Sequence, residues 1–260
     1  MKRRPPEQTE AVVLRLLDYG ESDRIVTFFT ADHGKLAGFA KSARKSTKRF
    51  GNSLELFSHG TVFFVRRGGN LVFIEKCDVI DHHARIRDDL ERTLTASYMA
   101  ELVERFTIEE KPIPSLFTFF IRFLRFTETC QPSELLLRLF ELTLLTETGY
   151  KPHLERCVSC GKHIDMIAHP VFSPQEGGIL CERCAPSHMN TFALSPGTVK
   201  MLLMGRRLDL DKIHRLVPSP QALRESREFM QNFIRYILGR EIQSLFVLNQ
   251  IRRLTGTPGT

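Results

Sequence analysis

The sequence reads Cys157-Val158-Ser159-Cys160 and, twenty residues later, Cys181-Glu182-Arg183-Cys184. In each Cys-x-x-Cys pair, two thiolates from one tight turn can reach a single tetrahedral ion, and the other pair completes the shell. Gly161 and Gly177-Gly178 beside the pairs supply the backbone freedom that such turns need. The separation lies at the upper edge of the range for zinc sites. This stretch therefore predicts a zinc knuckle around which the chain is organised.

The number of cysteines predicts the kind of zinc site. Cys157, Cys160, Cys181 and Cys184 fill a tetrahedral shell and leave no position for water or substrate, so we expect one structural Zn²⁺ per chain. The alternatives are a metal-free relic and a pair of disulfides, which the two isolated cysteines, Cys77 and Cys130, disfavour. Nearby histidines are interpreted as surface residues or partners of the ligands, with the exchange of one for a cysteine ligand as a further alternative. They are His153, His163, His169 and His188.

Composition places the chain among ordinary globular proteins. Apolar residues make up 42% of the 260 positions and charged residues 26%. The length favours two or three small domains, with one large domain as the alternative. No run of 18 apolar residues occurs, so we expect neither a membrane span nor a membrane partner. The basic start, residues 1–6, is followed by no apolar signal core, and we expect the protein in a reducing cytoplasm.

The net charge of +7 is unevenly distributed. Residues 1–85 hold 15 Lys and Arg against 10 Asp and Glu, whereas the remaining 175 residues hold 22 against 20. This asymmetry favours a polyanion-binding face in the N-terminal third, with ordinary solvated surface charge as the alternative.

Residues 10–81 carry the signals of five strands. The strands are expected at residues 12–16, 25–29, 35–40, 61–65 and 71–74, the last two flanking a hairpin loop at residues 66–70. So short an all-β unit must close on itself or leave exposed edges. We therefore expect a five-stranded oligonucleotide-binding (OB) barrel, with an SH3-like barrel as the alternative.

The segment from Gly34 to Leu54 contains no acidic residue. Its cations are the candidate DNA-binding residues: Lys35, Lys41, Arg44, Lys45, Lys48 and Arg49. Phe39 and Phe50 lie among them, and for each a place in the barrel core is preferred to a stacking role. Cations that follow a nucleic-acid backbone while rings stack on bases are typical of single-strand binding. The segment thus favours nucleic acid over a merely solvated basic loop.

From Ile86 the apolar period becomes helical. One stripe runs to Phe106, and a break at residues 111–114 precedes a helix that Ser115 is expected to cap. Pro132-Ser133 begins a leucine-rich helix, Ser195 caps another after the cysteines, and a further helix runs from Pro220 to Gly239 before a last apolar segment. The sequence thus predicts an α+β multidomain protein: an OB barrel at 1–82, an all-helical domain in two halves at 83–152 and 191–260, and the inserted four-cysteine zinc knuckle at 153–190.

The motifs of known enzyme classes are missing. The sequence holds no phosphate-binding Gly-x-x-x-x-Gly-Lys-Ser/Thr, no Gly-x-Ser-x-Gly and no His-Glu-x-x-His. Asp81-His82-His83 could suggest a metal, but neighbouring strand residues point to opposite faces, so a loop or helix turn is the preferred interpretation. We expect no catalytic residue, no small-molecule substrate and no enzymatic activity.

The order of these parts resembles the RecO family of bacterial recombination mediators. Local matches are Tyr19-Gly20-Glu21-Ser22-Asp23-Arg24-Ile25-Val26, Gly34-Lys35-Leu36-Ala37-Gly38-Phe39-Ala40-Lys41, Thr148-Gly149-Tyr150-Lys151-Pro152-His153 and Leu238-Gly239-Arg240. They extend over nearly the whole chain, and their order and spacing together are specific. Where family members commonly carry a glycine after the lysine matching Lys41, this chain has Ser42.

The resemblance implies a non-enzymatic DNA repair factor. Such a protein binds single- and double-stranded DNA, anneals complementary strands coated by single-strand-binding protein, and works with RecR to load RecA. The resemblance places DNA on the segment from Lys35 to Arg49, and the C-terminal tail of single-strand-binding protein on a groove of the helical part. The implied location is the bacterial cytoplasm, at the nucleoid during repair.

Two other classes stay open at this point. One is a zinc-stabilised protein-interaction adaptor without DNA activity of its own, which an absence of DNA binding at low salt would favour. The other is a nucleic-acid-processing enzyme whose site matches no known motif, which metal-dependent turnover of a labelled oligonucleotide would reveal.

Overall fold

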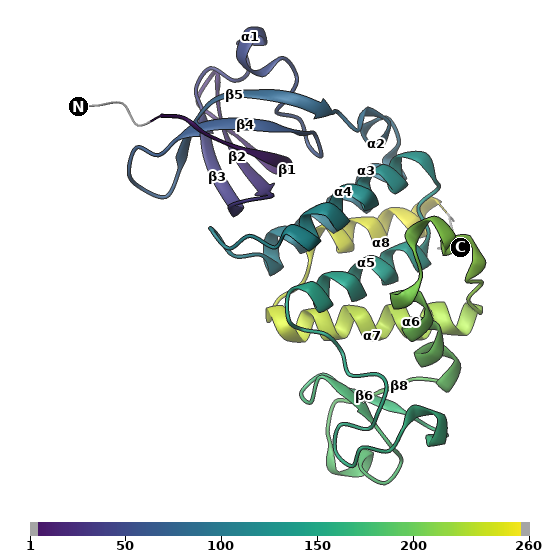
Figure 1. Cartoon of the computed structure of the whole chain (residues 1–260). Helices are drawn as coiled ribbons and strands as arrows, with labels where there is room; N and C mark the ends of the chain where they lie inside the picture. Colours follow the sequence, from purple (N-terminus) through teal and green to yellow (C-terminus); the bar gives the residue numbers. More distant parts are fainter. Residues whose placement is uncertain (1–4, 256–260) are drawn as a thin grey trace. The chain divides into compact units, whose positions relative to one another are not determined.

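The structure is a computed structural model that describes residues 5–255 (Figure 1). The chain divides into two compact units, the first ending at Gln131 and the second beginning at Pro132. The basic start of the sequence lies largely outside the described residues, and the four domain ranges expected from the sequence stay a prediction. Within residues 5–255 no helix is long and apolar enough to cross a membrane.

Five strands in the first unit form a closed barrel. They are β1 (Glu7–Tyr19), β2 (Asp23–Thr30), β3 (Gly34–Ala40), β4 (His59–Val65) and β5 (Val72–Asp81). The order around the barrel is β1-β2-β3-β5-β4, and neighbouring strands are antiparallel except for the parallel pair β3–β5. A short helix, α1 (Thr47–Phe50), lies between β3 and β4. The predicted five-stranded OB-like barrel is confirmed.

Alternating side chains of the strands fill the barrel interior. Val26, Phe28 and Phe64 are fully buried there. Phe50 of α1 and Leu54 belong to the same buried cluster. The connection between β3 and β4 is therefore tied to the barrel at its C-terminal side, which gives its basic residues a fixed base.

The parallel pairing that closes the barrel is short and depends on a glycine. Gly38 pairs with Val72, and Phe39 pairs with Phe73. A Cβ atom at position 38 would lie 2.4 Å from Cδ1 and 2.6 Å from Cγ1 of Ile74. Because the interior is already filled, a side chain at this position would displace the buried side chain of Ile74 from its place in the core.

A β-bulge in β1 divides the outer surface of that strand into two parts. The register of β1 on β2 shifts after Val13, and a bulge re-aims the side chains that follow it. Phe29 of β2, which pairs before the bulge, packs on Phe117 of α4 (Pro114–Thr129) with ring centres 5.7 Å apart. Beyond the bulge, Leu17 is 54% exposed and Tyr19 57%. A helix of the same unit thus covers one part of the outer surface and leaves the other part open.

Three helices complete the first unit: α2 (Ala84–Arg87), α3 (Leu90–Phe106) and α4. The apolar stripe from Ile86 to Phe106 predicted one helix, but Asp89 interrupts it and caps α3 by accepting a backbone N–H of the first turn at 2.9 Å. The prediction that Ser115 caps α4 is wrong. The N-cap is Ile113, and Pro114 occupies the first turn, where the missing proline N–H costs no hydrogen bond.

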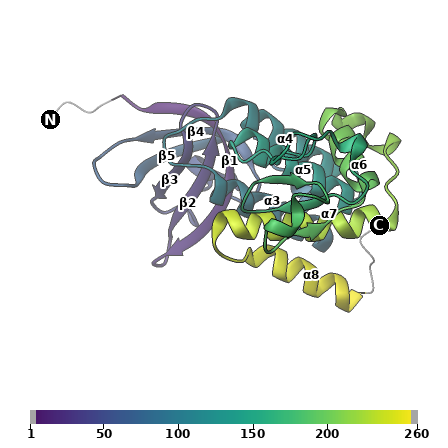
Figure 2. The same cartoon turned by 90° about the horizontal axis from the view of Figure 1, so that it is seen from below.

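The second unit combines four helices with a small sheet. The helices are α5 (Glu134–Glu147), α6 (Pro196–Arg207), α7 (Pro220–Leu238) and α8 (Gln243–Thr255), and the strands are β6 (Val171–Ser173), β7 (Gly178–Leu180) and β8 (Phe192–Ala193). Ser195 caps α6, as predicted, and Ser133 caps α5 at the predicted start of that helix. Figure 2 shows α8 running in the opposite direction to α7. Phe172 of β6 packs on Phe229 of α7 with ring centres 4.4 Å apart, which fixes the sheet on the helices.

A buried carboxylate, Glu134, links three helices of this unit. It lies in the first turn of α5, where it accepts hydrogen bonds from Arg227 of α7 at 2.9 Å and from Arg252 of α8. Burial alone would raise the pKa of Glu134, but the charges of Arg138, Arg227 and Arg252 hold it below its ordinary value. The carboxylate is therefore ionised at neutral pH and stabilises the helix packing as an anion.

Replacing Glu134 by glutamine keeps the shape of the side chain and removes this charge. Because removing one partner of a buried ion pair costs about 3–5 kcal/mol, we expect Glu134→Gln to lower the free energy of unfolding by about 3 kcal/mol near neutral pH. A carboxylate with a lowered pKa stabilises the fold above its unfolded-state pKa, and this stabilisation is lost as the pH falls through its folded-state pKa. The stability difference between wild type and Glu134→Gln should therefore shrink below about pH 4. Urea unfolding at both pH values checks this, with the exposed Glu228→Gln as control. Equal stability of Glu134→Gln and wild type at neutral pH would contradict this role.

Candidate metal centre and nucleic-acid interface

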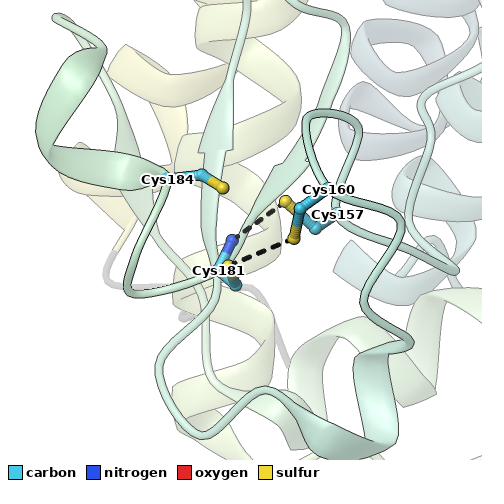
Figure 3. Close-up of side chains that lie close together, drawn as sticks. All are labelled: Cys157, Cys160, Cys181 and Cys184. Atoms are coloured by element: carbon cyan, nitrogen blue, oxygen red, sulfur yellow. Dashed lines mark hydrogen bonds between the residues drawn. The ribbon is translucent and has the colours of Figure 1, made fainter.

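Four cysteine side chains of the second unit gather in one place (Figure 3). The sulfurs of Cys157, Cys160, Cys181 and Cys184 all lie within 4.8 Å of one another, and those of Cys160 and Cys181 are 3.6 Å apart. Four thiolates on one tetrahedral ion, at the usual metal–sulfur distance for zinc, would be about 3.8 Å apart. All six cysteines of the chain are free of disulfides. The four sulfurs are thus close enough to hold one metal ion.

Backbone hydrogen bonds build the two turns that carry the cysteines. Gly161, in the left-handed region with φ +77°, donates its N–H to the carbonyl of Cys157 at 2.8 Å. In the second turn, the N–H groups of Cys184 and Ala185 donate to the carbonyl of Cys181 at 3.0 and 2.9 Å. The N–H of Cys181, which follows β7, donates to Sγ of Cys157 at 3.4 Å. These bonds bring the two pairs together and explain why a glycine follows the first.

Backbone N–H groups also favour the metal-binding form of the sulfurs. Burial alone would raise the pKa of Cys157 and of Cys181. Hydrogen bonds from neighbouring backbone N–H groups outweigh it, so the pKa of Cys157 is lowered and that of Cys181 falls to about 6. Because the thiolate is the form that binds a metal, the sulfurs of Cys157 and Cys181 are prepared for a cation. For Cys184 a hydrogen bond with Ser159 favours the thiolate, but burial and hydrogen bonds with the other three cysteines outweigh it and raise its pKa to about 11.

The side chains of two of the four histidines of this region have other partners. Nδ1 of His163 lies 3.2 Å from the carboxylate of Asp165, and Nδ1 of His188 lies 3.0 Å from the carbonyl oxygen of Cys184. Among the described residues, the group of possible ligands at this point consists of cysteines. The structure thus gives no support to a histidine in place of a cysteine ligand.

We expect Cys157→Ser with Cys160→Ser to remove bound metal and to lower the melting temperature, because a structural metal contributes its binding energy to folding. Metal content by elemental analysis and thermal unfolding with and without chelator check this. Cys77→Ser, which alters a buried cysteine outside the cluster, is the control for metal content. Unchanged stability in a double variant without metal would show that the cluster does not support the fold.

In the first unit, hydrogen bonds fix the basic loop that follows β3. Ser42 has a φ of +56°, a conformation that glycine adopts more readily than serine. Its N–H donates to Oδ1 of Asp23 at 2.7 Å, and the N–H of Arg44 donates to the carbonyl of Ser22 at 3.0 Å. Residues at and next to the turn between β1 and β2 therefore accept hydrogen bonds from the loop and hold it in place. They do so although this chain has Ser42 where the sequence pattern noted above has glycine.

The two arginines of the loop are engaged with the protein itself. Nη1 of Arg44 lies 3.8 Å from the carboxylate of Asp18. Arg49 donates to the carbonyl of Lys41 at 2.5 Å, and its guanidinium carbon lies 4.9 Å from the centre of the Phe50 ring. Both arginines thus help to shape the loop.

The lysines of the expected DNA-binding site lie in two separate places. Lys41, Lys45 and Lys48 are exposed, and within residues 5–255 their ammonium groups have no ion-pair or hydrogen-bond partner. Lys35 is not brought together with them. It lies at the other end of β3, and its ammonium donates to the carbonyl of Glu104 in α3 at 3.0 Å. The open positive charge therefore comes from the loop and α1.

An outward row of apolar side chains crosses four strands next to this loop. Leu17, Ile25, Phe39 and Phe73 are successive cross-strand neighbours on β1, β2, β3 and β5. They stand outside the buried cluster of the barrel. Of the two phenylalanines in the basic segment, Phe50 is thus a core residue, whereas Phe39 belongs to this outward row.

Two residues that the sequence did not single out extend the row. The ring of Tyr19 stands edge-on to Phe39 with centres 5.8 Å apart, and the guanidinium of Arg67 lies 3.9 Å from the centre of the Phe73 ring. The outward position of Tyr19 and Phe73 follows from the bulge and the barrel register, neither of which the sequence reveals. Arg67 could have been recognised from the sequence, because it lies in the hairpin loop at residues 66–70 beside a second arginine.

A closed five-stranded barrel with an open aromatic row beside a basic connection has the architecture of OB-type binding proteins, many of which bind oligonucleotides. The models Recombination protein O N terminal and Recombination protein O C terminal match residues 1–83 and 87–246. The DNA repair protein RecO of Syntrophus aciditrophicus is 42% identical over 257 residues, which cover 98% of this chain and 99% of that protein. Those of Desulfatibacillum aliphaticivorans and Bacillus pumilus are 35% and 30% identical over 254 and 247 residues, 96% and 95% of this chain. The chain belongs to the RecO family.

Proposed function

We propose that this protein is a recombination mediator in DNA repair. It binds single- and double-stranded DNA, anneals complementary strands coated by single-strand-binding protein, and with RecR promotes the loading of RecA. Membership in the family and the names of its relatives support the role in DNA repair. The observation that carries the proposal for this chain is the group of three open lysines beside the outward row.

The three lysines would reduce the electrostatic repulsion between two DNA strands. Each cation that contacts a phosphate releases condensed counterions, so binding gains free energy and the strands repel each other less. Because Lys41, Lys45 and Lys48 make no ion pairs within the described chain, no internal contact must break before they meet phosphate.

The outward row would provide stacking contacts for the bases. Open ring faces of Tyr19 and Phe39 can stack on a base without regard to its identity, whereas Arg67 already lies over the ring of Phe73. Phe39 and Phe73 are only half exposed, so stacking there is limited in area. Strong phosphate contact with modest stacking leaves the pairing edges of the bases free, which annealing requires.

We propose that the four-cysteine cluster holds one zinc ion with a structural role. A ligand set made only of thiolates selects zinc over harder cations. With four protein ligands no position stays open for a reactant, so the ion would stabilise the region rather than act on a substrate.

The protein partners are proposed from the family alone. They are RecR, the C-terminal tail of single-strand-binding protein and, indirectly, RecA, and the proposed location is the cytoplasm, at the nucleoid during repair. Annealing makes and breaks no covalent bond, so the proposed function is not enzymatic.

Strand annealing tests the proposal directly. Complementary labelled oligonucleotides coated with cognate single-strand-binding protein are mixed with and without the zinc-loaded protein, and no nucleotide is added. Acceleration by the wild type that the lysine variant below lacks supports the mediator role. Absence of acceleration by folded, zinc-loaded protein would instead favour an adaptor without DNA activity of its own.

Reversing Lys41, Lys45 and Lys48 to glutamate should remove most DNA binding, while the arginine contacts keep the loop folded. If each lysine meets one phosphate, the negative slope of log affinity against log salt should become less steep by about 2 for single strands. Fluorescence anisotropy at several salt concentrations measures both. A matched variant with Arg207, Lys212 and Arg215 of the second unit reversed to glutamate should bind as the wild type does. Equal losses in the two variants would place the site elsewhere.

Tyr19→Ala should weaken single-strand binding by about tenfold, because stacking of a base on an aromatic ring contributes about 1–3 kcal/mol. The salt slope should stay unchanged, since no charge is lost. Tyr236→Ala is a matched control, because Tyr236 of the second unit is 57% exposed, as is Tyr19. Unaltered affinity of Tyr19→Ala would exclude Tyr19 from the contact with bases.

A further inference from the structure

A second group of possible metal ligands lies in the first unit, where β5 ends. Asp81 is the last residue of β5, His83 precedes α2, and Glu128 comes from the last turn of α4. One ligand atom of each lies within 4.8 Å of the other two. Nδ1 of His83 is 3.0 Å from Oε2 of Glu128 and 3.6 Å from Oδ1 of Asp81.

We propose that Asp81, His83 and Glu128 bind a divalent cation of the Mn²⁺ type. Neighbouring ligands in an octahedral shell with metal–ligand distances of about 2.1 Å lie about 3 Å apart, which matches the separation of His83 and Glu128. One imidazole nitrogen with carboxylate oxygens suits Mn²⁺, whereas the four thiolates of the second unit suit zinc. The chain would then hold two metals of different chemistry.

The ring of His83 is fully buried and directed at the two carboxylates. Its Nε2 is buried without a hydrogen-bond partner in the described chain, so the polar contacts of the ring are those of Nδ1. Backbone N–H groups orient both carboxylates: that of His83 donates to Asp81 at 3.0 Å and that of Arg85 to Glu128 at 3.2 Å. Each carboxylate keeps further lone pairs for a cation.

Charge and access also favour a cation. The two carboxylates place two negative charges beside a buried ring. Of the two nearby arginines, Arg92 donates to the backbone carbonyls of Thr127 and Glu128 and, within the described chain, makes no ion pair with either carboxylate. Nε of Arg125 is 4.0 Å from Asp81, and its side chain is 58% exposed. The side chains of Asp81 and Glu128 are 35% and 17% exposed, so a hydrated ion can reach them from solvent. The competing arrangement is a hydrogen bond between Nδ1 of His83 and Oε2 of Glu128, without a metal.

Binding of Mn²⁺ to the full chain, with zinc already at the cysteines, separates the two arrangements. Electron paramagnetic resonance should show one saturable Mn²⁺ site per chain, and Mn²⁺ should raise the melting temperature. Asp81→Asn and Glu128→Gln should each weaken binding by at least about tenfold. Glutamine has the shape of glutamate and can still accept the N–H of Arg85, so Glu128→Gln should stay folded.

Glu104→Gln is the matched control. Glu104 is a helical carboxylate of the same unit, 16% exposed and paired with Arg15, and it lies outside the proposed ligand group. Its replacement should leave Mn²⁺ binding unchanged. Absence of a saturable site in the wild type, full binding by Glu128→Gln, or an equal loss in Glu104→Gln would overturn the proposal and leave the three residues as a hydrogen-bonded junction.

Discussion

Closure of the barrel rests on the parallel contact between β3 and β5, where only Gly38 and Phe39 meet Val72 and Phe73. Without this contact β3 and β5 would each present an unpaired edge. The same contact sets Phe39 beside Phe73 on the outer surface and places Lys41 two residues further along the chain. The outward row and the basic loop therefore depend on a pairing in which a side chain at position 38 would collide with Ile74.

Local signals in the sequence were sufficient for much of the fold. Strand periodicity predicted the five strands, and the spacing of the cysteines predicted the cluster. Ser133 and Ser195 marked the starts of their helices. These features depend on residues close together in the chain. Ser115 misled because a serine is a common N-cap, whereas here Pro114 takes the first helical position, which proline favours.

Features that depend on distant residues were not predictable. The contact of Lys35 with Glu104 joins residues 69 positions apart, and it separates Lys35 from the other lysines of the expected site. The group formed by Asp81, His83 and Glu128 needs α4 to return to the end of β5, so Asp81-His82-His83 alone gave no reason to prefer a metal. The half-exposed position of Phe39 likewise follows from the closed barrel rather than from its neighbours in sequence.

The division between arginines and lysines in the basic loop has a mechanical consequence. Arg44 and Arg49 hold the protein, and the charge left open is carried by lysines. A guanidinium fixes a phosphate through a rigid, paired geometry, whereas an ammonium on a flexible stem attracts it from many directions. A strand held only by such ammonium groups can slip by one nucleotide without losing a fitted contact. Under the proposed annealing function, two strands held in this way would compare successive alignments until their bases match.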